Sequence, residues 1–264
     1  MSSYSSTAVN SAVMLALQAT NLTSDNDTSF ISRAYNGGDL DKYRARIRAI
    51  GFVDHNRVLD AGCGFGQWSV ALSEVNARVM GTDIDPTRIE VATNISRTLG
   101  ITNIDYSAIE MGRDEIRSGD FDAIFSYNAL ALSPFRQTIK DFYRILRTGG
   151  YLYFNAYDLG WMIHNILEIH NPANDFDPRQ WGIDSIFHTL NYLGGRGFSS
   201  RSPRDSMLIP QELVKTDLLA MGFEILSICG DGMTSTFGEH GQQPFFPGNK
   251  YGLPAVYEVL CQKL

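Results

Sequence analysis

The sequence predicts a doubly wound α/β fold, in which helices cover both faces of a mostly parallel sheet. Strand-like and helical segments alternate between residues 57 and 155, as they do where parallel strands are joined by right-handed crossovers. An apolar strand runs directly into three glycines at alternate positions, before a plausible helix. Near the C-terminus, two strands are separated by a Gly- and Pro-rich loop, which favours an antiparallel pair.

Seven strands are expected, with helices between most of them. Tyr43, Ile47 and Ile50 place apolar side chains on one side of the first of these helices. Asp85 and Pro86 suit the N-cap and first turn of another. The expected order is helix 39–50, strand 57–60, helix 67–75, a strand ending at 83, helix 86–99, strand 104–108, strand 121–127, helix 134–146, strand 151–155, helix 210–221, strand 223–229 and strand 255–261.

The segment VLDAGCGFG, from Val58 to Gly66, constrains the chemistry most tightly. Glycines at alternate positions allow a sharp turn and let backbone amides approach a ligand. A tight turn with no ligand is the alternative. The third glycine comes after two residues, whereas the dinucleotide-binding fingerprint places it after three. Asp60 precedes the glycines, where a carboxylate disfavours a pyrophosphate but can receive an ammonium group.

A second acid, Asp83, ends the next strand about 20 residues after the glycines, where α/β nucleotide sites place the acid that binds ribose hydroxyls. Its alternative role is a helix N-cap before Pro86. Asp85 fills that position better, because Pro86 then stands at the first helical position. Asp83 is therefore the predicted ribose-binding residue.

Composition favours a small or neutral substrate over nucleic acid. The 264 residues include 22 Lys and Arg against 29 Asp and Glu, a net charge of -7, which argues against a broad nucleic-acid footprint. Three cysteines without CxxC spacing indicate neither a disulfide framework nor a zinc site. Residues 8–19 lack the basic start and continuous apolar core of a secretory signal, and no stretch is long enough to span a membrane. A cytoplasmic enzyme is expected, and the oligomeric state stays open.

The chain resembles the class I S-adenosylmethionine-dependent methyltransferases. The resemblance rests on four blocks in the family's order: VLDAGCGFG at 58–66, GTDID at 81–85, FDAIFSYNAL at 121–130 and RILRTGGYLYFNA at 144–156. It covers residues 57–156 well and the C-terminal strands more loosely. It implies a Rossmann-like sheet with an antiparallel C-terminal hairpin, S-adenosyl-L-methionine as cofactor and S-adenosyl-L-homocysteine as product.

The resemblance and the strand-end rule together place the cofactor. The methionine part is expected over Asp60, with the ribose on Asp83 and the adenine between Ile84 and the end of the third strand. Tyr35 either closes over the cofactor or packs against the sheet. Glu110 is either an adenine neighbour or a solvated side chain. The cofactor-binding residues are predicted to be Tyr35, Asp60, Gly62, Cys63, Gly64, Gly66, Asp83, Ile84, Ile109, Glu110, Tyr127 and Asn128.

Residues 157–209 form a longer insertion than a compact family member needs, and a lid or substrate cap is expected there. The segment holds two of the three Trp and three of the five His, a composition that suits a sugar ring or a planar small molecule. His164 and Asp158 lie nearest the fifth strand, and His164 is the predicted base; a structural role is its alternative. Tyr127, at the end of the fourth strand, is expected beside the transferring methyl.

Four segments follow from this interpretation. Residues 1–50 are a helical segment over the cofactor site, 51–156 the cofactor-binding core, 157–209 the substrate cap, and 210–264 the C-terminal helix and edge strands. The predicted reaction is methyl transfer to an oxygen or nitrogen of a small molecule or saccharide. A catalytically inactive cofactor-binding module and an NAD-linked oxidoreductase are the alternatives. No metal is expected, because Ser126, Tyr127 and Asn128 stand where related metal-dependent enzymes place acids.

Overall fold

The computed structural model describes residues 4–20, 22–111, 115–198, 205–237 and 244–264. They form a seven-stranded sheet in the order β3-β2-β1-β4-β5-β9-β6, which confirms the predicted fold class. A separate short hairpin pairs β7 with β8. The strands are β1 (Arg57–Ala61), β2 (Arg78–Asp83), β3 (Ile104–Ala108), β4 (Phe121–Ser126), β5 (Leu146–Tyr157), β6 (Phe223–Gly230), β7 (Asn249–Lys250), β8 (Leu253–Pro254) and β9 (Val256–Lys263).

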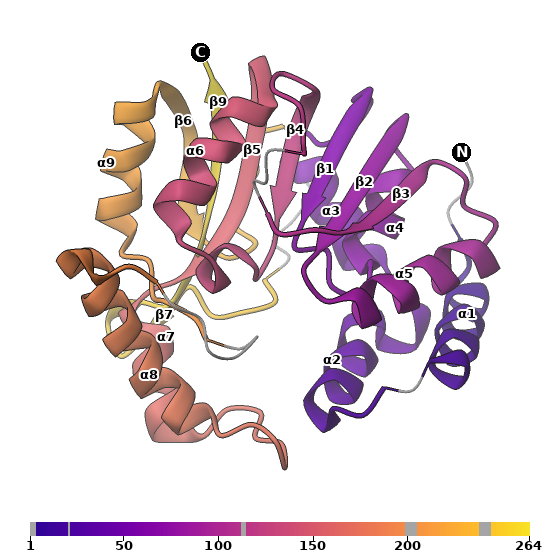
Figure 1. The fold of residues 1–264 in the computed structure, drawn as a ribbon, viewed down its shortest axis with the longest axis horizontal. Helices are drawn as coiled ribbons and strands as arrows, with labels where there is room; N and C mark the ends of the chain where they lie inside the picture. Colours follow the sequence, from indigo (N-terminus) through magenta and orange to yellow (C-terminus); the bar gives the residue numbers. More distant parts are fainter. Residues whose placement is uncertain (1–3, 21, 112–114, 199–204, 238–243) are drawn as a thin grey trace.

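Helices cover both faces of this sheet (Figure 1). One buried apolar cluster joins the sheet to α1 to α5, and a second joins its other face to α6 and α9. The helices are α1 (Ser6–Ala19), α2 (Asp25–Tyr35), α3 (Asp41–Ala49), α4 (Gln67–Ser73), α5 (Pro86–Thr98), α6 (Phe135–Ile145), α7 (Leu159–Glu168), α8 (Pro178–Asn191) and α9 (Gln211–Met221), with the short turns η1 (Asn36–Gly38), η2 (Leu130–Leu132) and η3 (Tyr192–Arg196).

The strand order reverses at β1, which pairs in parallel with β2 on one side and with β4 on the other. A ligand of a doubly wound sheet binds outside the carboxyl ends of the strands at such a reversal. In this chain the segments that leave those ends are the glycine loop after Ala61 and the turn after Ser126. Both come from the motifs that the sequence singles out.

Two boundaries differ from the sequence prediction. The polar composition of residues 20–29 predicts a linker or cap, but α2 begins at Asp25, because the Ser24 side chain caps it by accepting a hydrogen bond from Asp27 N. The fifth strand is predicted to start at Tyr151, after the glycines that follow α6. It starts at Leu146, which pairs with Phe121 across an irregularity in the register.

The C-terminal pair is antiparallel, as predicted. β9 runs antiparallel to both β5 and β6, and β6 forms the edge of the sheet. Residues 157–209 contain α7, α8 and η3, and α7 packs against the β7–β8 hairpin and α8. Among the described residues no helix is long and apolar enough to cross a membrane.

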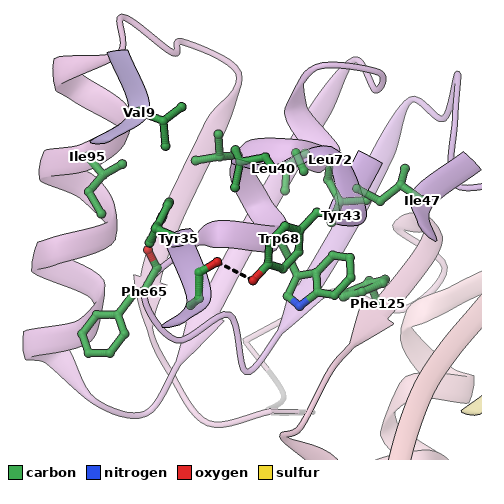
Figure 2. Packing of buried hydrophobic residues seen from close by; sticks show 14 of the residues in the cluster. Val9, Tyr35, Leu40, Tyr43, Ile47, Phe65, Trp68, Leu72, Ile95 and Phe125 are labelled. Carbon is green, nitrogen blue, oxygen red and sulfur yellow. Dashed lines mark hydrogen bonds between the residues drawn. The ribbon is translucent and has the colours of Figure 1, made fainter. Parts of the chain in front are cut away.

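An aromatic cluster fixes α3 and α4 on the sheet (Figure 2). The Trp68 ring lies 4.5 Å from Tyr43 and 4.6 Å from Phe125, measured between ring centroids, with the Tyr43 ring edge-on. Tyr43 also donates a hydrogen bond to the Ala34 carbonyl at the end of α2. The N-terminal helices are thus attached to the start of the helix that follows the glycine loop.

A buried group of charges ties α3 to the C-terminal half of the chain. Arg46 is 1% exposed, and its Nη1 donates to Asp231, Glu258 and Tyr153 at 2.7 to 3.1 Å. Tyr127 donates to the same Asp231 carboxylate at 2.7 Å. The Arg46 guanidinium therefore pairs with two buried carboxylates, both of which lie far from it in the sequence.

Replacing Arg46 with Met should destabilise the fold by about 3 to 5 kcal/mol, because two buried carboxylates would lose their cationic partner. Urea denaturation at pH 7 measures the change. Arg48 lies on the same helix with an exposed side chain, so R48M is the matched control and should stay within about 0.5 kcal/mol of the parent. A loss below about 1 kcal/mol in R46M would contradict this account.

Candidate active site

The loop between β1 and α4 is shaped by glycines that leave little room for side chains. Gly62 has a φ of +76°, and a Cβ there would lie 2.2 Å from the Cβ of Ala129. Its backbone N–H donates to the Thr82 carbonyl at 2.7 Å, and the next amide donates to the same oxygen at 2.8 Å. At Gly64, with φ +54°, the nearest atom to an added Cβ would be Phe30 Cε1 at 3.7 Å. The loop thus leaves space on the side that faces α2.

Asp60 lies beneath this loop with its carboxylate almost fully buried. Its Oδ2 accepts a hydrogen bond of 2.5 Å from the Ser69 hydroxyl, and no described Lys, Arg or His forms an ion pair with it. Burial raises the pKa of Asp60 to about 7, an effect that the Ser69 hydrogen bond opposes and neighbouring Asp83 reinforces. A positively charged ligand group would relieve this cost.

Asp83 holds the loop from the end of β2. One carboxylate oxygen accepts from the Gly64 amide and the other from the Asp85 amide, each at 3.0 Å. Burial raises the pKa of Asp83, and its hydrogen bonds with the two backbone amides lower it in part. Asp85, as predicted, caps α5 by accepting from the Thr87 and Arg88 amides. Asp83 is therefore not needed as the cap, and its carboxylate lies within hydrogen-bond distance of the glycine loop.

The other predicted cofactor residues surround these two acids in different ways. Tyr35 is buried and donates to the Phe65 carbonyl at 2.8 Å, so of its two predicted positions it packs under the loop. Cys63 is buried beside Asp60. Ile84 is 67% exposed, as an uncovered apolar surface. Ile109 packs at the margin of the core beyond β3, and Glu110 follows it, half-buried.

A cavity of about 500 Å³ lies next to this loop. Helix α2, the start of α4, the ends of β4 and β5, and the cap all contribute to its walls. Aromatic rings dominate, and all three tryptophans of the chain are among them. The lining residues are Asn26, Phe30, Arg33, Ala34, Tyr43, Gln67, Trp68, Tyr127, Asn128, Tyr157, Trp161, Asn165, His170, Asn171, Phe176, Trp181, Phe245 and Phe246.

The end of β4 reaches this cavity, as the sequence predicts. Asn128 has a φ of +56°, and its backbone N–H donates to Asn155 Oδ1 at 2.6 Å, while Asn155 Nδ2 donates back to Asn128 Oδ1 at 2.9 Å. Tyr127 packs its ring between Trp68 and Phe246. Its hydroxyl is held by Asp231, and burial raises its pKa well above the usual value. Tyr127 therefore forms a wall of the cavity, and its hydroxyl keeps its proton near neutral pH.

Two predicted catalytic residues do not line the cavity. Asp158 is the N-cap of α7: it accepts from the Leu159 amide at 2.7 Å and from the Gln211 amide at 2.9 Å. His164 is buried behind Trp161 and His170, with ring centroids 5.2 Å from each, and its Nδ1 lies 3.4 Å from the Glu168 carboxylate. The structure corrects both assignments, because helix capping and packing already use these side chains.

His170 occupies the place at the cavity that was predicted for His164. The two are six positions apart in the sequence, and only the turn after α7 brings the later one to the surface of the cavity. Burial lowers the pKa of His170, and His164 and Arg33 nearby lower it further. Gln67 was also missed: its Oε1 is buried at the cavity and has no hydrogen-bond partner among the described residues. Its position directly after the last glycine of the loop is the sequence feature that could have identified Gln67 as a site residue.

The sheet is doubly wound, a glycine loop follows β1, and β1 and β2 each carry an acid near the carboxyl end. This combination is typical of enzymes that bind a nucleotide-like cofactor, and three comparisons name the class. A family described as a methyltransferase domain matches residues 58–150. A methyltransferase-family protein of Geobacillus sp. (strain WCH70) is 26% identical over 221 residues, 78% of this chain and 89% of that protein. The ubiquinone biosynthesis O-methyltransferase of Nitrosococcus oceani is 31% identical over 102 residues, 38% of this chain and 43% of that enzyme.

The fold is also similar to that of solved methyltransferase structures. The solved structure of an S-adenosylmethionine-dependent methyltransferase from Listeria monocytogenes is similar with a TM-score of 0.58 and 17% identity, over 84% of this chain and 98% of that one. Residues 58–150 are therefore a methyltransferase domain, and the relatives and the fold are those of S-adenosylmethionine-dependent methyltransferases, consistent with class I of that family. The resemblance to S-adenosylmethionine-dependent methyltransferases that the four sequence blocks indicate is confirmed. These comparisons do not support the alternative of an NAD-linked oxidoreductase.

The unusual environment of Asp60 gives a prediction for the free protein. Its folded pKa of about 7 lies above the ordinary value of 3.8, so the folded protein binds this proton more tightly than the unfolded chain. The stabilising contribution is complete below about pH 4 and is lost as the pH rises through about 7. Carboxyl ¹³C NMR should show one aspartate titrating near pH 7, and this signal should be missing in D60N. A midpoint below about pH 5 would contradict the account.

Proposed function

We propose that this enzyme transfers the methyl group of S-adenosylmethionine to an oxygen or nitrogen atom of a small organic molecule bound in the aromatic cavity. The observation that carries the proposal is the adjacency of two features. The cavity begins at Gln67 and Trp68, immediately after the glycine loop that Asp60 and Asp83 support. A cofactor on the loop and an acceptor in the cavity would therefore meet.

The residues around the loop suit this cofactor. Asp60 is a buried carboxylate with a raised pKa and no basic partner among the described residues, which fits an ammonium group reached directly or through water. Asp83 keeps lone pairs beyond those used by two amides, and vicinal ribose hydroxyls would complete its hydrogen bonding. Ile84 exposes an apolar side chain just after the end of β2, as a face for adenine would.

The reaction depends more on aligning the two reactants and excluding water than on acid catalysis. Bound S-adenosylmethionine supplies an electrophilic methyl group on a positively charged sulfur. Trp68 and Tyr127 exclude water from the junction between loop and cavity, and holding two reactants in line can supply most of a rate enhancement. Gln67 Oε1, which has no hydrogen-bond partner in the part of the chain that the structure describes, would accept a hydrogen bond from a bound ligand and help to orient it.

His170 is the group proposed to accept a proton from the acceptor. It is the one described histidine that lines the cavity, and no described Asp or Glu lines it. Because its pKa is lowered, the ring is neutral at pH 7 and can take a proton. A neutral base and the lack of a carboxylate to hold an ammonium group favour a hydroxyl acceptor over an amine, so oxygen is the preferred target. The O-methyltransferase of Nitrosococcus oceani is in keeping with that choice.

Calorimetric titration with S-adenosylmethionine, S-adenosylhomocysteine and NAD tests the first half of the proposal. Micromolar binding of the first two, about -8 kcal/mol, is expected. Methyl transfer is then followed with tritiated cofactor against a panel of phenols, hydroxy acids, amines and sugars. Cofactor binding with no product from any acceptor would favour an inactive binding module, and binding of NAD alone would overturn the proposal.

Replacing Asp83 with Ala should weaken S-adenosylmethionine binding by about 1 to 3 kcal/mol, the scale for losing hydrogen bonds to a charged group. The cause would be both the lost ribose contacts and the lost support of the Gly64 amide. Calorimetry measures the affinity, and circular dichroism confirms folding. Asp105 lies at an exposed position on the neighbouring strand β3, so D105A serves as the control. Unchanged affinity in folded D83A would remove the ribose assignment.

Replacing His170 with Gln should slow methyl transfer about 10²-fold, the lower end for loss of a general base. In the parent, turnover should fall as the pH drops through the lowered pKa of His170, below 6.5, because protonation removes the base. H170Q should lose this acidic limb. H188Q is the matched control, since His188 is a half-buried histidine on α8 that does not line the cavity. If the pH profile of H170Q matches that of the parent, His170 is not the base.

A further inference from the structure

The charges at the cavity are unbalanced. Its lining holds one arginine, Arg33, and one histidine, His170, whereas no described aspartate or glutamate lines it. The two are close enough for the Arg33 charge to lower the pKa of His170. Arg33 comes from α2 and His170 from the turn after α7, so two distant segments bring a cation and a neutral imidazole to the same part of the cavity.

Arg33 has no carboxylate partner among the described residues. Its Nη1 donates to the Ser29 hydroxyl at 2.6 Å, one turn earlier on α2. The acids at the start of the same helix are occupied elsewhere: Asp27 pairs with Arg88 at 2.7 Å, and Asp25 accepts from Asn174 at 2.7 Å. Partial burial lowers the pKa of Arg33, although the residue is exposed enough for a ligand to reach it.

The other acids near the cavity lie outside its lining and are hydrogen-bonded elsewhere, among them Asp175, which accepts from the Ser24 hydroxyl and the Asn26 amide. Asp231 lies behind Tyr127 and Phe246, but Arg46, the Tyr127 hydroxyl and the amides of Phe245 and Phe246 occupy its two oxygens. Glu168, the acid nearest His170, is exposed and accepts from the Tyr251 hydroxyl at 2.6 Å. Lys42 adds a further cation 5.8 Å from the Phe245 ring. Among the described lining residues, the one full charge at pH 7 is therefore the Arg33 guanidinium.

We propose that the acceptor carries an anionic group, such as a carboxylate, which pairs with Arg33 at one end of the cavity while its apolar body lies on the rings of Trp161, Trp181 and Phe246. This deepens the proposed function, since it rests on the cavity being the acceptor site. An arginine fork bonds a carboxylate in a bidentate fashion, and broad aromatic rings supply contact area to a planar or apolar body. The arginine repels a protonated amine, and it offers a neutral sugar hydrogen bonds but no charge pairing.

Three matched probes test the ligand class without methyl transfer. 2-Naphthoate, 2-naphthamide and 2-naphthylmethylammonium share one apolar body and differ in charge. Calorimetry on the full chain should give an affinity for naphthoate about tenfold above that for the amide, and the ammonium should bind weakest. In R33Q the preference for naphthoate over the amide should fall to about twofold or less, and R33K should restore part of it.

Two controls make the result specific. Arg97 lies on the exposed face of α5 and, like Arg33, donates to a polar side chain on its own helix, so R97Q should leave all three affinities unchanged. Trp161→Ala should weaken the three probes alike, because it removes the shared aromatic contact. S-Adenosylhomocysteine is titrated in parallel, and its affinity for R33Q should stay within about twofold of the parent.

The outcomes separate this inference from the proposed function. Equal affinities for the three probes, tighter binding of the ammonium, or no binding of any probe would overturn the anionic acceptor. A matching loss of S-adenosylhomocysteine affinity in R33Q would overturn it as well, because Arg33 would then serve the cofactor's carboxylate. Failure of S-adenosylhomocysteine to bind the parent, with the naphthoate preference intact, would remove the proposed function and leave an anion-selective cavity.

Discussion

The buried charge cluster around Arg46 is the constraint on which the architecture of the site depends. Its members come from α3, β5, β9 and the segment after β6, and Asp231 also binds Tyr127 and the amides of Phe245 and Phe246. A buried carboxylate without partners costs several kcal/mol, so these segments can be buried only together. The same contacts position three aromatic walls of the cavity. The packing of the N-terminal helices and the shape of the proposed acceptor site therefore depend on the same buried contacts.

The site is divided between two kinds of support. The cofactor side is local: a glycine loop follows one strand, acids end two neighbouring strands, and backbone amides of the loop donate to Thr82 and Asp83. The acceptor side is assembled from distant segments, including α2, the turn after α7 and the loop before β7. Substrate range can therefore change through the cap and C-terminal loop while the cofactor geometry is kept by the sheet.

Helix α2 links the two sides, because Phe30 lies near the glycine loop and Arg33 lies at the cavity. Across the cavity, Asp175 of the cap accepts hydrogen bonds from the Ser24 hydroxyl and the Asn26 amide at the start of the same helix. These contacts are exposed, and such bonds are individually weak. They connect the N-terminal segment with residues 157–209 beside the cavity, which Asn26 lines.

The sequence by itself determined the sheet, the glycine loop and the two acids, because each depends on chemistry within a few residues of the chain. Alternating apolar segments specify strands, glycines specify the turn, and an acid after a strand lies at its carboxyl end whatever the remaining contacts are. The two candidate catalytic side chains that do not line the cavity both belong to residues 157–209. His164 and Asp158 have the right residue type near the right strand, but the direction in which each side chain points is decided by helix packing and capping. Only the tertiary structure could select His170 and Arg33, since the walls of the cavity come from segments that no local pattern relates.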